Sequence, residues 1–249
     1  MKLGVFDSGI GGLTVVKSLL DHQLFEEIIY YGDTARVPYG TKDKNTIIRY
    51  AIEAVEFFKN FELDLIIVAC NTVSAYALNE MREASSCPVI GVVEAGILAC
   101  SNSLKDKNSN ILILGTNATV KSHAYEEGLK NNGFTNIDAK ATGLFVPLVE
   151  EEIFTGAILE ETFQYYFKDL KKKPDAIILG CTHFPLLSDS LQNYFGNSTK
   201  LIHSGEAIVQ DLENKFNFST KYKNPKLKFF ASENPDALKR VAKKWLTLN

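Results

Sequence analysis

Two cysteines stand at the ends of apolar runs that have the same layout. Cys70 lies in "DLIIVACNTVSA", and Cys181 lies in "DAIILGCTHFPL". Each is followed at once by short polar residues, Asn71-Thr72 in the first run and Thr182-His183 in the second. A buried cysteine by default packs as a small hydrophobe, and we interpret Cys87 and Cys100 in that way. Cys70 and Cys181 are instead candidate functional thiols.

Paired thiols of this kind suit proton transfer at a carbon atom. One nucleophilic cysteine with His183 as its base would be enough for acyl transfer, and a disulfide redox pair usually keeps its cysteines close in sequence. Two thiols on opposite faces of a substrate can remove a proton from one side and deliver one from the other, which inverts the centre. The acid and the base must both be poised near the working pH. By motif position, Asp7 and His183 are the candidate helpers.

The setting of each thiol also predicts its acidity. Both cysteines come just before an expected helix, whose dipole stabilises a nearby thiolate. This setting predicts a pKa below the value of about 8.5 that is usual for a free cysteine. The hypothesis further requires that both sulfur atoms line one shared cavity.

Four segments repeat a pattern of apolar strand, turn of small polar residues, and helix. Their hydroxyl and amide groups could cap the helix that follows, or bind an anion together with free backbone N–H groups. Plain capping remains the alternative for any single residue, such as Ser8, Thr72, Thr119 or Thr182. No nucleotide motif is present, since "DSGIGG" is not GxGxxG and "GTNATVKS" lacks a GK[ST] ending. The four segments are "GVFDSGIGGLTV", "IIVACNTVSA", "LILGTNATVKS" and "IILGCTHFPL".

The elements that must position these turns alternate along the chain. Such alternation of short β-rich runs with helical patterns predicts an α/β fold with mostly parallel sheets. The C-terminal edges of parallel strands then lie on one side, where ligands usually bind. The polar stretch 101–110 is a candidate linker. A helix is expected between the second and third strands, with one face made of Ile47, Ala51, Ala54, Val55, Phe58 and Phe61. The expected strands are 3–6, 27–32, 64–69, 88–93, 110–115, 136–141, 175–180, 200–203 and 226–231.

The composition narrows the class of protein. With 249 residues, 45% of them hydrophobic and 23% charged, the chain can form one large domain or two smaller ones. A net charge of −3 argues against a nucleic-acid or membrane-surface specialist. No apolar run approaches the ~20 residues of a membrane span, and the start "MKLGVFDSG" turns polar too early for a signal peptide. We therefore expect a cytoplasmic protein, and without a CxxC pair no structural zinc site.

The motifs together resemble those of the glutamate racemases, cofactor-independent members of the aspartate/glutamate racemase superfamily. The paired CNT and GCTH motifs mark the superfamily, and DSGIGG with "DTARVPYG" narrows the resemblance to glutamate racemase. It implies two similar α/β domains, related by a pseudo-twofold axis, with the active site in the cleft between them. The first domain would comprise 1–92 plus 206–249 and carry Cys70. The second would comprise 93–205, carry Cys181 and include the stretch 101–110.

The resemblance also implies roles for individual residues. Cys70 would take the α-proton from D-glutamate and Cys181 from L-glutamate, with no cofactor, neither pyridoxal phosphate nor metal. Asp7 would assist Cys70, and His183 would assist Cys181. Glu150 matches a family acid near that histidine, although Glu151 and Glu152 leave the register open. The implied substrate-binding set is Asp7, Ser8, Pro38, Tyr39, Gly40, Asn71, Thr72, Thr116, Thr119 and Thr182.

Further expectations follow from the same resemblance. The enzyme would supply D-glutamate for peptidoglycan, and so serve cell-wall biogenesis and cell shape, as a homodimer without nucleic-acid or membrane partners. Because the first motif starts within four residues of Met1, we expect none of the activator dependence that accompanies an N-terminal extension in some members. Arg36 has two readings, as a clamp for a substrate carboxylate or as a structural residue of its loop. Trp245 is expected to pack in the core.

Three alternatives remain open at this point. An aspartate or other amino-acid racemase of the same superfamily would share the motifs, because side-chain length is read by the shape of the pocket. A hydrolase using Cys181 and His183 would leave Cys70 with a structural role. A non-catalytic, two-lobed amino-acid-binding protein would give no reason for paired thiols.

Overall fold

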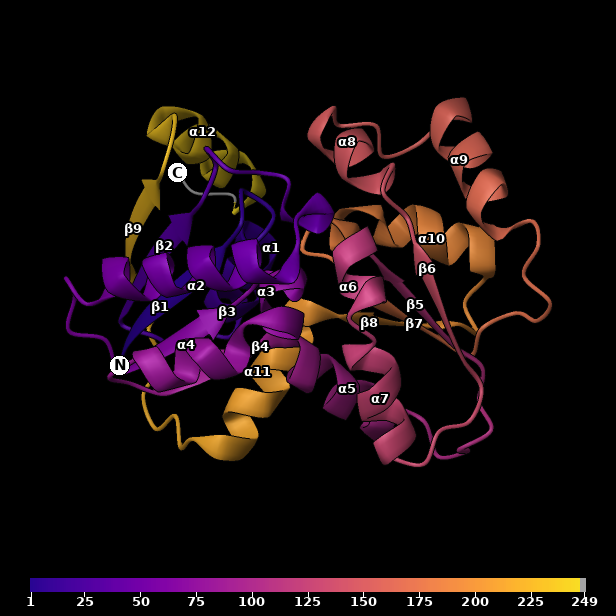
Figure 1. Cartoon of the computed structure of the whole chain (residues 1–249), viewed down its shortest axis with the longest axis horizontal. Coiled ribbons are helices and arrows are strands. Elements are labelled where there is room, and N and C mark those ends of the chain that lie inside the picture. The colour runs from indigo at the N-terminus through magenta and orange to yellow at the C-terminus, as the bar shows by residue number, and fades with distance from the viewer. Residues whose placement is uncertain (247–249) are drawn as a thin grey trace.

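Two parallel β-sheets lie side by side, each flanked by helices (Figure 1). The computed structural model describes residues 1–246. The first sheet has the order β4-β3-β1-β2-β9 and the second β6-β5-β7-β8, and every pairing is parallel. The first sheet contains β1 (Lys2–Asp7), β2 (Glu27–Gly32), β3 (Leu65–Val68), β4 (Val89–Gly91) and β9 (Lys226–Ala231). The second contains β5 (Ile111–Gly115), β6 (Ile137–Ala141), β7 (Ala176–Gly180) and β8 (Lys200–His203). The predicted α/β class with mostly parallel sheets is confirmed.

Helices cover both faces of the first sheet. One face packs against α1 (Leu13–Asp21), α11 (Ser204–Lys215) and α12 (Pro235–Trp245). The other packs against α2 (Lys44–Phe58), α3 (Asn71–Tyr76) and α4 (Leu78–Ala84). Because successive side chains of a strand point to opposite faces, Val5 enters the first cluster and Phe6 the second. Coverage on both faces explains why β3 reads as an unbroken apolar run.

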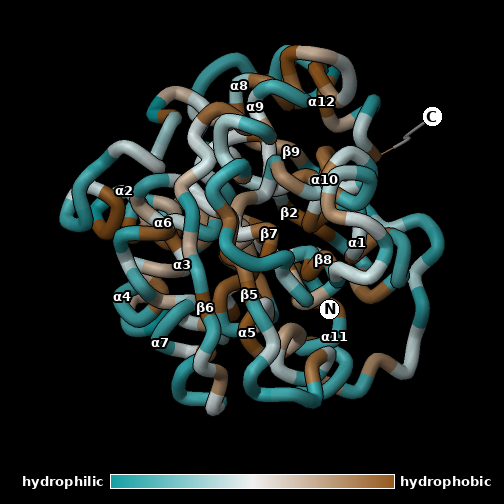
Figure 2. Tube along the Cα trace, turned by 90° about the vertical axis from the view of Figure 1, so that its right-hand side faces the viewer, coloured by the Kyte–Doolittle hydropathy of each residue, from teal (hydrophilic) through white to brown (hydrophobic). Residues whose placement is uncertain are grey.

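The second sheet is also covered on both faces. One face carries α8 (Phe145–Glu150), α9 (Ala157–Phe167) and α10 (Ser188–Phe195). The other packs against α5 (Val92–Ser103) and α7 (Ala124–Asn131), and the short α6 (Asn117–Lys121) follows β5. Two 3-10 helices, Tyr39–Thr41 (η1) and Phe184–Leu187 (η2), lie in the turns after β2 and β7. Figure 2 shows hydrophobic residues concentrated along the central strands and hydrophilic residues on the outer loops.

The nine expected strands form, with two differences in the detail of the elements. Val92 and Val93 begin α5 instead of extending β4. They read as strand because α5 is buried on two sides, with Val92 in a cluster of the first sheet and Val93 in one of the second. Phe61 lies beyond the end of α2, in the following loop, yet still packs against the same cluster as that helix.

The chain crosses from the first sheet to the second through α5 and the loop 104–110. It returns through α11, and β9 closes the first sheet beside β2. The predicted limits of two domains, 1–92 plus 206–249 and 93–205, stay a prediction, and residues 247–249 lie outside the described part. Within residues 1–246, no helix has the length and hydrophobicity that crossing a membrane requires.

Candidate active site

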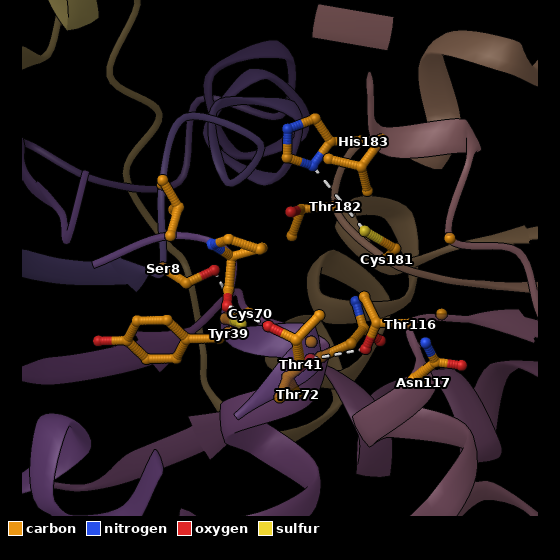
Figure 3. Close-up of a pocket in the computed structure, with 18 of the residues that line it drawn as sticks. Ser8, Tyr39, Thr41, Cys70, Thr72, Thr116, Asn117, Cys181, Thr182 and His183 are labelled. Carbon is orange, nitrogen blue, oxygen red and sulfur yellow. Dashed lines mark hydrogen bonds between the residues drawn. The ribbon is translucent and has the colours of Figure 1, made fainter. Parts of the chain in front are cut away.

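The C-terminal ends of strands from both sheets border one cavity of about 290 Å³. Cys70 and Cys181 both line it, so the two sulfur atoms share a cavity as the hypothesis requires. Figure 3 shows Cys70 beside Ser8, and Cys181 beside Thr182 and His183. Of the predicted site residues, Asp7 and Thr119 do not line the cavity. Those that line it are Ser8, Pro38, Tyr39, Gly40, Cys70, Asn71, Thr72, Thr116, Glu150, Cys181, Thr182 and His183.

Cys70 lies between β3 and α3, where its extended backbone forms the N-cap of the helix. Its thiol donates a hydrogen bond to Ser8 Oγ over 3.4 Å. Burial raises the pKa of Cys70 to about 12, and the nearby Asp7 carboxylate adds to the rise. The predicted lowering of this pKa is therefore wrong, because desolvation outweighs the dipole of a helix only six residues long. Cys70 rests as a thiol, the form that gives up a proton.

Cys181 has different surroundings. Its Sγ lies 3.8 Å from His183 Nδ1, and His183 Nε2 lies 3.2 Å from Glu150 Oε1. Burial acts to lower the pKa of His183, but the adjacent Cys181 sulfur and Glu150 carboxylate outweigh it and raise that pKa to about 10. An imidazolium at His183 suits a thiolate at Cys181. The two thiols thus have different neighbours, the Asp7 carboxylate near Cys70 and the His183 ring beside Cys181.

Asp7 lies behind the cavity wall and joins the two turns that face each other there. Gly9 N–H donates to its Oδ2 over 3.0 Å, and the Thr182 hydroxyl donates to its Oδ1 over 3.3 Å. Burial raises the pKa of Asp7, and His183 acts against that rise. The carboxylate acts on Cys70 through its field, since it helps to keep that thiol protonated.

The buried Asp7 carboxyl should therefore lower the stability of the fold while it supports activity. In Asp7→Asn, the amide can accept from Gly9 and donate to Thr182 without carrying a buried charge. As pH rises from about 4, the unfolded Asp7 ionises first, so the wild type loses stability that the variant keeps. We expect racemisation to fall, while a gain of about 1 kcal/mol raises Tm by about 2–4 °C at pH 7. Thermal unfolding of both proteins at pH 4 and pH 7 checks this. A variant less stable than the wild type at pH 7 would contradict it.

A glycine of "DSGIGG" allows the two sides of the site to pack closely against each other. A Cβ atom on Gly11 would lie 2.3 Å from Thr182 Oγ1 and 2.6 Å from His183 Nδ1. Beside it, the Thr14 hydroxyl donates to the backbone carbonyl of Thr182 over 2.8 Å. Gly40 is similar, because its Cβ would lie 2.6 Å from Thr116 Cβ. These positions lack side chains because the opposite turn occupies the space.

Three threonine hydroxyls form a compact cluster at one side of the cavity. Thr72, Thr116 and Thr119 have their Oγ1 atoms 3.0 to 3.1 Å apart in all three pairs. Thr116 Oγ1 also accepts from Thr119 N–H, so it caps α6 while it lines the cavity. Capping and cavity lining are therefore combined in Thr116, and Thr119 supports it from behind.

The Pro38-Tyr39-Gly40 loop is held by a charged network. The Tyr39 hydroxyl donates to the fully buried Asp33. Arg36 Nε lies 2.6 Å from Asp33 Oδ2, and its guanidinium also pairs with Glu53. Arg36 does not line the cavity, so the structural reading of this residue fits and the clamp reading does not.

Glu150 is the glutamate of "VEEE" that faces the histidine. Glu152 instead pairs with Lys244 of α12, and Glu151 is exposed. We therefore expect Glu150→Gln to lower the pKa of His183 and to reduce kcat about 10-fold, the factor that one pKa unit represents. Glu151→Gln is the matched control and should match the wild type. The pH dependence of kcat for the three proteins tests this, and equal profiles for Glu150→Gln and wild type would refute it.

Some residues of the cavity were not predicted. Asn117 directly follows Thr116, and Thr142 follows β6 in the same strand–turn–helix pattern as the four recognised segments. The signal at Thr142 was weak because β6, "IDAKA", is only partly buried and mixes polar with apolar residues.

Trp245 packs with clusters of both sheets and meets the His183 ring edge-on, with 6.5 Å between centroids. Among residues 1–246 no group of three or more His, Cys, Asp or Glu is placed to hold a metal ion.

Comparison with known proteins identifies the class. The sequence profile of the Asp/Glu/Hydantoin racemase family matches residues 14–212. The chain belongs to this family of racemases. The glutamate racemase of a Nitratiruptor species is 61% identical over 246 residues, which cover 99% of this chain and 96% of that protein. The resemblance to glutamate racemases drawn from the motifs is thereby confirmed.

The solved structures to which this fold is similar include glutamate racemases, in agreement with the sequence comparison. The crystal structure of glutamate racemase from Campylobacter jejuni has a TM-score of 0.98 and 56% identity, and the match covers 100% of this chain and 99% of that one. An aspartate racemase from Picrophilus torridus has a TM-score of 0.64 with 18% identity, over 86% of this chain and 93% of that one. The second likeness extends to the fold alone.

Proposed function

We propose that this chain interconverts L- and D-glutamate by proton transfer between the substrate α-carbon and two thiols. The observation that carries the proposal is one cavity lined by both Cys70 and Cys181, with the His183 ring and Glu150 beside the second thiol. Full-length relatives at 51–61% identity that are named glutamate racemase support the choice of substrate.

In the L-to-D direction the Cys181 thiolate takes the α-proton of L-glutamate. The Cys70 thiol gives its proton to the opposite face of the same carbon, and D-glutamate leaves. The enzyme then holds a thiol at Cys181 and a thiolate at Cys70, the form that accepts D-glutamate for the reverse reaction. Proton exchange with water also returns it to the starting form. Asp7 and His183 bias these two states, and Glu150 keeps His183 charged.

The α-proton of an amino acid is a very weak acid, so the cavity must stabilise negative charge that develops on the carbon. Fixed dipoles in a site closed to water do this most effectively. The described cavity lining has hydroxyls of Ser8, Thr72, Thr116 and Thr182 but no lysine or arginine. These hydroxyls and nearby backbone N–H groups are suited to hold the two carboxylates of glutamate.

The cellular role follows from the product and from the chemistry of the thiols. D-glutamate would serve peptidoglycan synthesis, and with it cell-wall biogenesis and cell shape. Because both thiols must stay reduced for turnover, a reducing compartment such as the cytoplasm fits the mechanism. We propose a homodimer from the family resemblance.

A direct assay tests the choice of substrate. Optical rotation or chiral chromatography would follow the conversion of each enantiomer of glutamate and of aspartate. We expect both glutamate enantiomers to be racemised and the aspartate enantiomers to react far more slowly. A preference for aspartate would replace the proposed substrate while keeping the two-thiol chemistry.

A further inference from the structure

We propose that Tyr125 and Ser204 are positioning residues that hold the two thiol-bearing turns at a fixed separation. Both do so by hydrogen bonding to the side chain of Asn71. This inference rests on the proposed two-thiol racemisation. Neither residue lines the cavity, so each would act through its neighbours and not on the substrate.

A buried chain of hydrogen bonds connects the two turns. The Tyr125 hydroxyl donates to Asn71 Oδ1 over 2.6 Å, and Asn71 Nδ2 donates to Ser204 Oγ over 3.4 Å. The Ser204 hydroxyl in turn donates to the Leu179 carbonyl over 3.2 Å. Asn71 directly follows Cys70, and Leu179 lies two residues before Cys181. This series of hydrogen bonds therefore joins one thiol turn to the other through the side chains of Asn71 and Ser204 and the backbone carbonyl of Leu179.

The ring of Tyr125 adds a packing contact to the same connection. A Cβ atom on Gly180, the residue before Cys181, would lie 3.3 Å from Cε2 of the ring. One on Gly96 of α5 would lie 3.2 Å from Cε1. Tyr125 thus touches the turn of Cys181 with its ring and the turn of Cys70 with its hydroxyl.

Burial makes the connection specific. Tyr125, Asn71 and Ser204 are each at most 3% exposed, so water cannot replace a lost partner without rearrangement. The Asn71 carbonyl oxygen is occupied by Tyr125, and its amide is directed to Ser204. Both polar groups of the Asn71 side chain therefore have a protein partner, although the residue borders the cavity. Removing one partner frees the Cys70 turn to shift relative to Cys181.

A shift of this kind affects the reaction more than binding. Proton transfer needs both sulfur atoms aligned with the α-carbon, and a misplacement of about 1 Å can reduce the rate about 100-fold. The hydroxyls proposed to hold the carboxylates keep their own contacts. We therefore expect Tyr125→Phe and Ser204→Ala each to lower kcat and kcat/KM equally, about 10- to 100-fold, with KM unchanged.

The experiment measures kcat and KM for L-glutamate in the wild type, Tyr125→Phe, Ser204→Ala and the double variant. Tyr194→Phe and Ser190→Ala are matched controls. They make the same chemical changes in α10, away from Asn71, and both should behave as the wild type. Because both residues act on Asn71, the double variant should lose less than the product of the single losses. If Tyr125→Phe fails to fold, Ser204→Ala carries the same prediction.

The outcomes separate this inference from the proposed function. A wild type that does not racemise glutamate would overturn the proposed function itself. A racemising wild type with both variants within about twofold of it would overturn only the inference. A raised KM with unchanged kcat would overturn it as well, because the network would then serve binding and not the alignment of the thiols.

Discussion

Replacing either Cys70 or Cys181 by alanine should reduce kcat for racemisation by at least about 10³-fold in both directions. Each thiol supplies a general acid or base that is commonly worth about 10²- to 10⁴-fold. Both act in every turnover, one as proton acceptor and one as donor. Without one of them, a proton removed from one face has no donor on the other. Steady-state assays from each glutamate enantiomer measure the loss.

Cys87→Ala is the matched control for these variants. Cys87 is partly exposed in the loop before β4, where its backbone N–H donates a hydrogen bond to Ser85 Oγ. It does not line the cavity, so its replacement should leave kcat unchanged. Retention of turnover in Cys70→Ala would contradict the two-thiol mechanism. It would mean that Cys181 and His183 move the α-proton without a second thiol.

Gly11→Ala should reduce kcat/KM about 100-fold or more although the added group is a single methyl. That methyl would meet Thr182 Oγ1 and His183 Nδ1 at distances well inside van der Waals contact. Neither neighbour can retreat freely, since Thr182 bonds to Asp7 and His183 lies against Cys181 and Glu150. Displacement of these groups by about 1 Å accounts for a loss of this size. The measurement is kcat/KM for both enantiomers.

Gly128→Ala provides a control with the same degree of overlap. A Cβ there would also come within 2.3 Å of a neighbour, but that atom is Ile97 Cδ1, the end of a flexible apolar side chain. Gly128 lies in α7 outside the cavity, so activity should stay near that of the wild type. Equal activity in Gly11→Ala and wild type would show that the close approach at Gly11 has no part in holding the site.

The sequence was most informative where local pattern and chemistry coincide. Unbroken apolar runs such as β5 and β7 predicted buried parallel strands, and the polar turns after them predicted where the site lies. Parallel strands bring their C-terminal ends together, so residues far apart in the chain, such as Ser8 and Cys181, reach one cavity. That much follows from the period of the strands and the chemistry of the turns.

What the sequence could not give depends on contacts between distant segments. The raised pKa of Cys70 comes from burial and from Asp7, neither of which a local helix-start pattern contains. The reason for Gly11 is the position of Thr182 and His183 on the other side of the cavity. Likewise, Tyr125 lies behind the site, and its hydrogen bond to Asn71 connects the turn of Cys70 to a helix that no motif marks.

The most direct test of the two-thiol mechanism is the fate of the α-proton in D₂O. L-glutamate is incubated with the wild-type enzyme, and both enantiomers are analysed at low conversion by mass spectrometry. The mechanism predicts deuterium at the α-carbon of the D-glutamate formed, while the remaining L-glutamate keeps its protium, because the proton leaves on one sulfur and a solvent deuteron arrives from the other. D-glutamate that retains the original proton, or equal labelling of both enantiomers from the start, would contradict it.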